Sequence, residues 1–157
     1  MKTPAPNRRD SLRVERMLLA PPQAVFKSWT TPHLMAGWLS PTRKAEVTAD
    51  VRVGGRFQVT MLGEGTRIEH HGEYLEVEPP HKLVFTWRSA FTGDRPSVVT
   101  VLLEPEGEHT RLVLTHEQLP YEQVAPHEGG WGTILANLAE SLSPGVTPQR
   151  SSSGAAW

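Results

Sequence analysis

The sequence of 157 residues contains no cysteine, so the chain has neither disulfide bonds nor thiolate chemistry. It also lacks any run of roughly 20 apolar residues, the length that a membrane-spanning helix needs. Its first residues, MKTPAPNRRD, carry charges with no apolar run behind them, unlike a secretory signal. These absences predict a single cytoplasmic domain without membrane insertion, because a chain of this length can bury a full core by itself.

An excess of either charge is also missing. The chain has 16 Lys and Arg residues against 17 Asp and Glu residues, which gives a net charge of -1. Its basic residues are scattered, and no basic stripe with interleaved aromatic residues occurs. We therefore expect no nucleic acid partner, since nothing in the sequence would attract a polyanion.

Motifs of common enzymes and metal sites are absent as well. There is no GxSxG nucleophile elbow and no HExxH, and the glycine pairs 54–55 and 129–130 fit neither the dinucleotide-binding pattern nor the P-loop. Among the seven histidines, His70 and His71 are neighbours in a predicted strand, so their side chains point to opposite faces. The sequence therefore predicts neither a metal site nor a cofactor.

Hydrophobic periodicity is the informative feature that is present. It predicts one strand, two short helices, several strands joined by short turns, and one long last helix, which is an α+β fold with an antiparallel sheet. Residues 1–10 and 144–157 read as flexible because they are polar or rich in Pro, Gly and Ser. The predicted strands are 11–19, 44–51, 56–62, 67–78, 81–89 and a hairpin over 98–119, and the predicted helices are 20–29, 33–39 and 121–143.

The start of the last helix, HEGGWGTILANLAESL (127–142), raises a question of its own. Gly129 and Gly130 each cost a helix about 1 kcal/mol relative to alanine. Two explanations stay open: the glycines loosen a gate or leave room beside Trp131, or they let the helix pack closely on a strand while Trp131 fills the core. The apolar stripe of this helix consists of Trp131, Ile134, Leu135, Leu138 and Leu142.

Five fragments in order resemble one known family: APPQAVFKSWTTPHLMAGWLSP, VGGRFQVTM, GEYLEVEPPHKLVFTW, TRLVLTHEQLP and HEGGWGTILANLAESL. Over residues 11–143 the chain resembles the activator of Hsp90 ATPase homologue 1-like (AHSA1-like) proteins of the START-like, or SRPBCC, superfamily. The resemblance implies a helix-grip (Bet v 1-like) fold, in which a curved antiparallel sheet of six to seven strands surrounds the C-terminal helix and a cavity. Members of the superfamily use that cavity for lipids, polyketides, hormones and other apolar ligands.

The resemblance also implies where a ligand would lie. Residues at strand ends and on the last helix of this fold line the open end of the cavity, although ordinary core packing is the alternative for each aromatic side chain. For His70 the strand parity decides: with a bulge at Tyr74-Leu75 it faces inward together with Leu75 and Val77, and without one it faces outward. The predicted ligand-binding residues are Trp38, Phe57, Met61, His70, Phe85, Trp87, His116, His127, Trp131 and Leu135.

Three functions follow from these expectations. The first is non-catalytic binding of a small hydrophobic or aromatic molecule or lipid. The second is a protein-interaction module like the Hsp90 co-chaperone, although that role also depends on a separate N-terminal domain for which this chain has no room. The third is an enzyme of the polyketide-cyclase type with His116 or His127 as the base. An exposed sheet edge would also allow a homodimer.

Overall fold

The computed structural model describes residues 9–93 and 95–143; residues 1–8, 94 and 144–157, and with them most of the two segments expected to be flexible, lie outside the described part. Three helices, two short 3₁₀ helices and seven strands follow one another in the predicted order. Their bounds are β1 Arg9–Leu18, α1 Pro22–Thr30, α2 Pro32–Met35, β2 Ala45–Ala49, β3 Arg56–Gly63, β4 Thr66–Glu78, β5 Lys82–Trp87, η1 Ala90–Thr92, β6 Ser97–Glu106, β7 His109–Pro120, η2 Tyr121–Gln123 and α3 Val124–Leu142.

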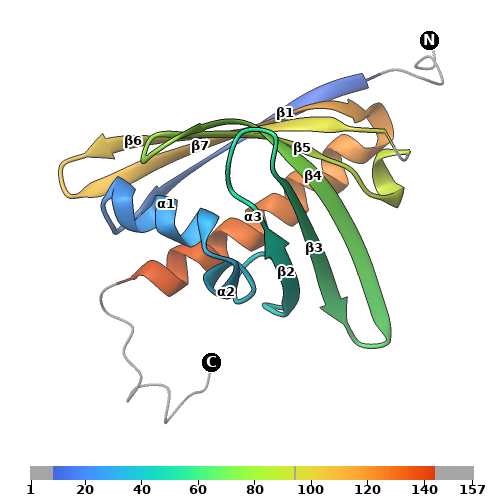
Figure 1. Ribbon diagram of the computed structural model, residues 1–157, viewed down its shortest axis with the longest axis horizontal. Coiled ribbons are helices and arrows are strands. Elements are labelled where there is room, and N and C mark those ends of the chain that lie inside the picture. Colours follow the sequence, from blue (N-terminus) through green and yellow to red (C-terminus); the bar gives the residue numbers. More distant parts are fainter. Residues whose placement is uncertain (1–8, 94, 144–157) are drawn as a thin grey trace.

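The seven strands form one antiparallel sheet in the order β1-β7-β6-β5-β4-β3-β2. Figure 1 shows the sheet curving around α3, with β2 and β3 bent away from the layer that contains β1 and β7. The α+β class and the helix-grip architecture expected from the sequence are confirmed. None of the helices in the described part is long and apolar enough to cross a membrane.

The close packing of β3, β4 and β5 depends on Gly72 in β4. Its cross-strand partner in β3 is Phe57, whose ring lies over the glycine. A Cβ atom at this position would lie 2.1 Å from the carbonyl oxygen of Thr86 and 2.2 Å from the Phe57 ring. Only glycine therefore allows the backbone of β5 and the ring of Phe57 to approach β4 together.

Replacing Gly72 with alanine is expected to lower the free energy of unfolding by about 3 kcal/mol, because backbone and ring must both move. Urea unfolding followed by circular dichroism measures this change. Gly129→Ala is the matched control, since a Cβ there has no neighbour within 4 Å. Equal stability of the wild type and Gly72→Ala would show that the close approach around Gly72 is not needed.

A bulge in β4 settles the facing of His70. The pairing of β4 with β5 shifts register between Tyr74 and Glu76, so of the two alternatives left open by the sequence, the one with a bulge at Tyr74-Leu75 is present. His70 faces inward with 5% of its surface exposed, and Val77 packs against the core. The expected inward facing of Leu75 was wrong: the extra residue of the bulge is 41% exposed, because it lacks a position in the ladder.

The last helix buries the stripe that its spacing predicts, with one change. Trp131, Ile134, Leu135 and Leu138 are buried, whereas Leu142 is only partly buried at the end of the helix. Asn137 is buried in addition, and its side-chain amide donates a hydrogen bond of 3.0 Å to the carbonyl oxygen of Ser40. This bond connects the C-terminal half of α3 to the segment after α2.

Candidate functional site

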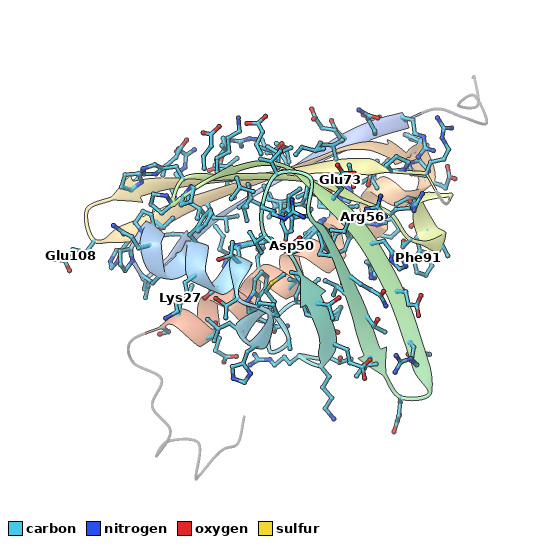
Figure 2. All side chains as sticks on the ribbon, in the orientation of Figure 1. Lys27, Asp50, Arg56, Glu73, Phe91 and Glu108 are labelled. Carbon is cyan, nitrogen blue, oxygen red and sulfur yellow. The ribbon has the colours of Figure 1, made fainter. Side chains whose placement is uncertain are left out.

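A pocket of about 480 Å³ opens at the N-terminal half of α3. β3, β4 and the end of β5 form one wall, α3 forms the other, and η1 closes the rim through Phe91. Figure 2 shows Phe91 at the end of the molecule where α3 begins. The lining residues are Pro41, Met61, Ile68, His70, Trp87, Phe91, Gln123, Pro126, His127, Gly130, Trp131 and Ile134.

Of the ten ligand-binding residues predicted from the sequence, five line this pocket: Met61, His70, Trp87, His127 and Trp131. The structure brings them together from three strands and one helix, although nearly 70 residues separate the first from the last. They share an inward position near the open end of the curved sheet.

The other five predicted residues are buried in the core and do not line the pocket: Trp38, Phe57, Phe85, His116 and Leu135. Phe85 and Phe57 border a void of about 10 Å³, which is too small for a ligand, and Phe57 also reaches the outer hollow described below. The ring of Trp38 lies edge-on against Trp29, with 4.7 Å between the ring centroids, and its indole N–H donates to the carbonyl oxygen of Ser28.

Several lining residues escaped the sequence reasoning. Phe91, Gln123 and Pro126 come from η1, η2 and the first turn of α3, where no periodicity indicates which side chains face inward. Ile68 had a usable signal, because it is two residues before His70 in the same strand and therefore lies on the same face.

His116 holds the centre of a buried hydrogen-bond chain beneath the pocket. The indole Nε1–H of Trp131 donates to His116 Nδ1 over 3.0 Å, and His116 Nε2 lies 2.7 Å from Ser97 Oγ. The hydroxyl of Ser97 donates in turn to the carbonyl oxygen of Trp87 over 2.6 Å. Since an indole nitrogen can only donate, Nδ1 of His116 must be unprotonated and Nε2 must carry the proton.

This chain of bonds leaves His116 neutral and fully occupied. Burial, with smaller contributions from the nearby His127 and His70, lowers its pKa to about 3. Nδ1 accepts from Trp131 and Nε2–H donates to Ser97, so neither nitrogen has a lone pair for a substrate. The position of Trp131, and with it one wall of the pocket, is fixed by this histidine.

Two further histidines present acceptor atoms to the pocket. His70 Nδ1 lies 3.3 Å from the carbonyl oxygen of Val59, and His127 Nδ1 lies 2.9 Å from that of Gln123. Because a carbonyl can only accept, Nδ1 carries the proton in both neutral rings, and each Nε2 keeps its lone pair. Burial lowers the pKa of His70 to about 4 and also lowers that of His127. Both rings are therefore neutral at pH 7.

Aromatic rings make up the floor between these histidines. The ring of Trp87 lies 4.7 Å from that of His70 and 5.3 Å from that of Trp131, measured between centroids. Trp87 Nε1 is buried without a hydrogen-bond partner in the described part of the chain, so it adds no accessible polar atom. The pocket wall is thus aromatic and aliphatic, with a few polar atoms at defined places.

The glycines at the start of α3 do not serve close packing. A Cβ atom at Gly129, Gly130 or Gly132 would have no neighbour within 4 Å, which contradicts the explanation that the helix needs them to approach a strand. Gly130 lines the pocket and Gly129 is exposed. The missing side chain at Gly130 therefore leaves room in the pocket, while Trp131 fills the core beside it.

Gly129→Ala and Gly130→Ala are each expected to raise the free energy of unfolding by about 0.5–1 kcal/mol, because each removes a glycine from a helix without a clash. Thermal unfolding measures both variants against the wild type. Destabilisation by either alanine would mean that the space around the glycine is needed by a neighbouring element.

A second hollow, of about 510 Å³, lies on the other face of the sheet. Its lining includes the outward side chains of Arg56, His71, Glu73 and Arg88. His71 confirms the predicted opposite facing of the two adjacent histidines: 46% of its side chain is exposed, and its Nε2 lies 3.6 Å from Glu69. Charged side chains therefore line this hollow, in contrast to the inner pocket. Within the described residues, no three His, Asp or Glu side chains come together as metal ligands.

The family described as activator of Hsp90 ATPase homolog 1-like protein matches residues 19–143. No curated protein matches the sequence. Among solved structures, a protein of Chromobacterium violaceum has a TM-score of 0.73 and 26% identity, over 86% of this chain and 99% of its own. An Hsp90 activator from Plasmodium falciparum has a TM-score of 0.59 and 27% identity, over 71% of this chain and 74% of its own. DynU16, a protein of the dynemicin biosynthetic locus, has a TM-score of 0.73 and 26% identity, over 87% of this chain and 48% of its own.

Proposed function

The chain belongs to the activator of Hsp90 ATPase homologue 1-like family, and from this premise we propose that it binds a small hydrophobic or aromatic molecule in the pocket beside α3 without transforming it. The observation that carries the proposal is the pocket itself, about 480 Å³ with a wall of aromatic and aliphatic side chains. A protein that used its sheet and helix only as a scaffold would fill this volume with side chains.

The energetics of the wall favour an apolar ligand. A bicyclic aromatic molecule buries an area like that of an aromatic side chain, about 150–250 Å². At about 25 cal/mol per Å², this burial contributes roughly 4–6 kcal/mol before the cost of association. The rigid walls formed by Trp87 and Trp131 keep that cost low, because the protein has little to rearrange.

Catalysis is less well supported by the same residues. His116, one of two candidate bases for a cyclase-type reaction, has both ring nitrogens engaged. No Asp, Glu, Lys or Arg occurs among the lining residues of the pocket. His127 keeps a free Nε2 that could act as a base. The one other titratable residue that lines the pocket in the described part of the chain is His70, so no carboxylic acid or lysine is available as the acid partner.

Calorimetric titration with 1-methoxynaphthalene, an uncharged apolar probe, tests the proposal. Saturable binding by the wild type is expected, and Gly130→Leu should abolish it by placing a side chain in the pocket. Gly129→Leu, with its side chain in solvent, is the matched control and should bind like the wild type. Absence of heat in the wild type, or equal binding by both leucine variants, would count against a ligand site here.

A protein-interaction function is the second candidate, and the likeness to the Plasmodium falciparum Hsp90 activator favours it. Under this alternative the chain would bind an Hsp90 chaperone through its outer surface and stimulate ATP hydrolysis. An ATPase assay with added chain distinguishes the two. Stimulation that Gly130→Leu leaves intact, together with no binding of 1-methoxynaphthalene, would favour interaction over ligand binding.

A further inference from the structure

The polar atoms of the pocket are unevenly divided between donors and acceptors. Five lining side chains carry polar atoms: His70, Trp87, Gln123, His127 and Trp131. Neither indole N–H is available to a ligand, because that of Trp131 donates to His116 and that of Trp87 is covered by other atoms. The Gln123 amide, which both donates and accepts, stands at the rim beside the two histidines.

The two histidines offer only acceptor atoms to a ligand in the pocket. Each Nδ1–H is directed to a backbone carbonyl, that of Val59 for His70 and that of Gln123 for His127. The backbone of Ile68 also acts on the ring of His70, but no hydrogen bond of suitable geometry is formed by either Nε2 within the described residues. Neither Nε2 belongs to the fully covered polar atoms. An accessible lone pair in an apolar wall gains most from a ligand that brings its own proton.

His70 is the deeper of the two. It is 5% exposed and its ring lies against Trp87, whereas His127 lies half-buried in the first turns of α3. Water can satisfy His127 at the rim, but a ligand that fills the pocket removes water from His70. An unpaired His70 acceptor would then reduce affinity, so the wall discriminates between ligands that donate to it and ligands that do not.

We propose that the pocket selects uncharged aromatic ligands that carry a hydroxyl or N–H group, and that this group donates a hydrogen bond to Nε2 of His70. The inference rests on the proposed function and adds the chemistry of the ligand to it. An anionic ligand is disfavoured, because no cationic side chain lines the pocket and the accessible histidine atoms are acceptors.

Three probes of one shape test the proposal by calorimetric titration at neutral pH: 1-naphthol, 1-methoxynaphthalene and 1-naphthoate. The wild type is expected to bind the naphthol roughly tenfold more tightly than the methoxy compound, the contribution of one buried hydrogen bond. The naphthoate is expected to bind at least roughly tenfold more weakly than the naphthol.

Two variants locate the acceptor. His70→Leu should reduce the preference for the naphthol over the methoxy compound to within about twofold, because the acceptor of the hydrogen bond is lost. His71→Leu is the matched control, because this neighbouring histidine lies on the outer face, and it should keep the full preference. Should His70→Leu fail to fold, the ¹⁵N signals of the histidine rings in the wild type give the same information: the naphthol should shift His70 Nε2, and the methoxy compound should not.

The outcomes separate this inference from the proposed function. Equal affinity for the naphthol and the methoxy compound would overturn the hydrogen bond to His70 and leave apolar binding intact. A preference that survives in His70→Leu, or a naphthol that leaves the Nε2 signal unchanged, would also overturn it. No binding of either uncharged probe would overturn the proposed function itself.

Discussion

Replacing Trp131 with alanine is expected to lower the free energy of unfolding by about 4 kcal/mol, the usual cost of deleting a large buried aromatic side chain. Trp131 is 2% exposed and packs between Trp29 and Trp87. The substitution also removes the indole N–H that donates a hydrogen bond to His116 Nδ1, which leaves this buried acceptor unpaired. Urea unfolding of the variant and the wild type measures the change.

Trp131→Phe separates these two contributions. Phenylalanine keeps an aromatic ring in the cluster but cannot donate to His116, so the expected loss is about 1–3 kcal/mol, near the cost of one unpaired buried acceptor and a small void. A Phe variant as unstable as the Ala variant would show that the hydrogen bond, rather than packing, holds Trp131. A variant as stable as the wild type would show that the bond contributes nothing.

Lowering the pH from 7 to 5 is expected to reduce the free energy of unfolding by about 4 kcal/mol, because His116 and His70 remain neutral in the folded protein. Their pKa values of about 3 and about 4 lie below the ordinary value of 6.5. Between these pKa values each histidine is protonated in the unfolded chain and neutral in the folded chain. The free energy of unfolding therefore falls by up to about 1.36 kcal/mol per pH unit for each histidine. The stability that they contribute is complete above pH 6.5 and is lost as the pH falls toward 4 and 3.

Urea unfolding at pH 7, 6 and 5 measures this dependence, whose slope should steepen as the pH falls and approach an uptake of about two protons on unfolding near pH 5. His116→Gln, although destabilised by the change in packing, should show a slope reduced by about one proton. A free energy of unfolding that stays constant from pH 7 to pH 5 would contradict the buried neutral state of both histidines.

Much of the fold could be predicted from periodicity. Alternation located every strand to within about two residues, and the spacing of Trp131, Ile134, Leu135 and Leu138 identified the buried face of α3. Local patterns suffice for β2 to β7 because each of these strands pairs with a neighbour in sequence, whereas β1 pairs with β7. The facing of His70 needed the bulge at Leu75, which depends on pairing with β5 and leaves no mark in β4 alone.

The pocket could be predicted only in part. Positions such as Trp87 and Trp131 follow from strand parity and from the apolar stripe of the helix. Phe91 and Gln123 lie in short 3₁₀ turns, where three-dimensional contacts rather than a repeat decide which side chains face inward. The engagement of His116 by Ser97 and Trp131 joins two strands and a helix, so no spacing in the sequence reveals it.

The alternatives for the glycines of α3 show the same limit. Sequence alone could not separate close helix packing from room for a ligand, because glycine serves both. The empty space around Gly129 and Gly130 removes the first alternative. Movement of the helix as a gate stays a prediction, and its natural test is whether Gly130→Ala slows ligand association while Gly129→Ala does not.

The central claim is that an apolar ligand occupies the pocket beside α3, and one titration tests it most directly. Indole N–H signals of ¹⁵N-labelled protein are followed while 1-methoxynaphthalene is added. We predict saturable shifts of Trp87 and Trp131, which line the pocket, with little change at Trp38, which packs against Trp29 outside it. Indole signals that stay unchanged up to the solubility limit of the probe would contradict the account. A shift of the Trp38 signal as large as that of Trp131 would contradict it as well.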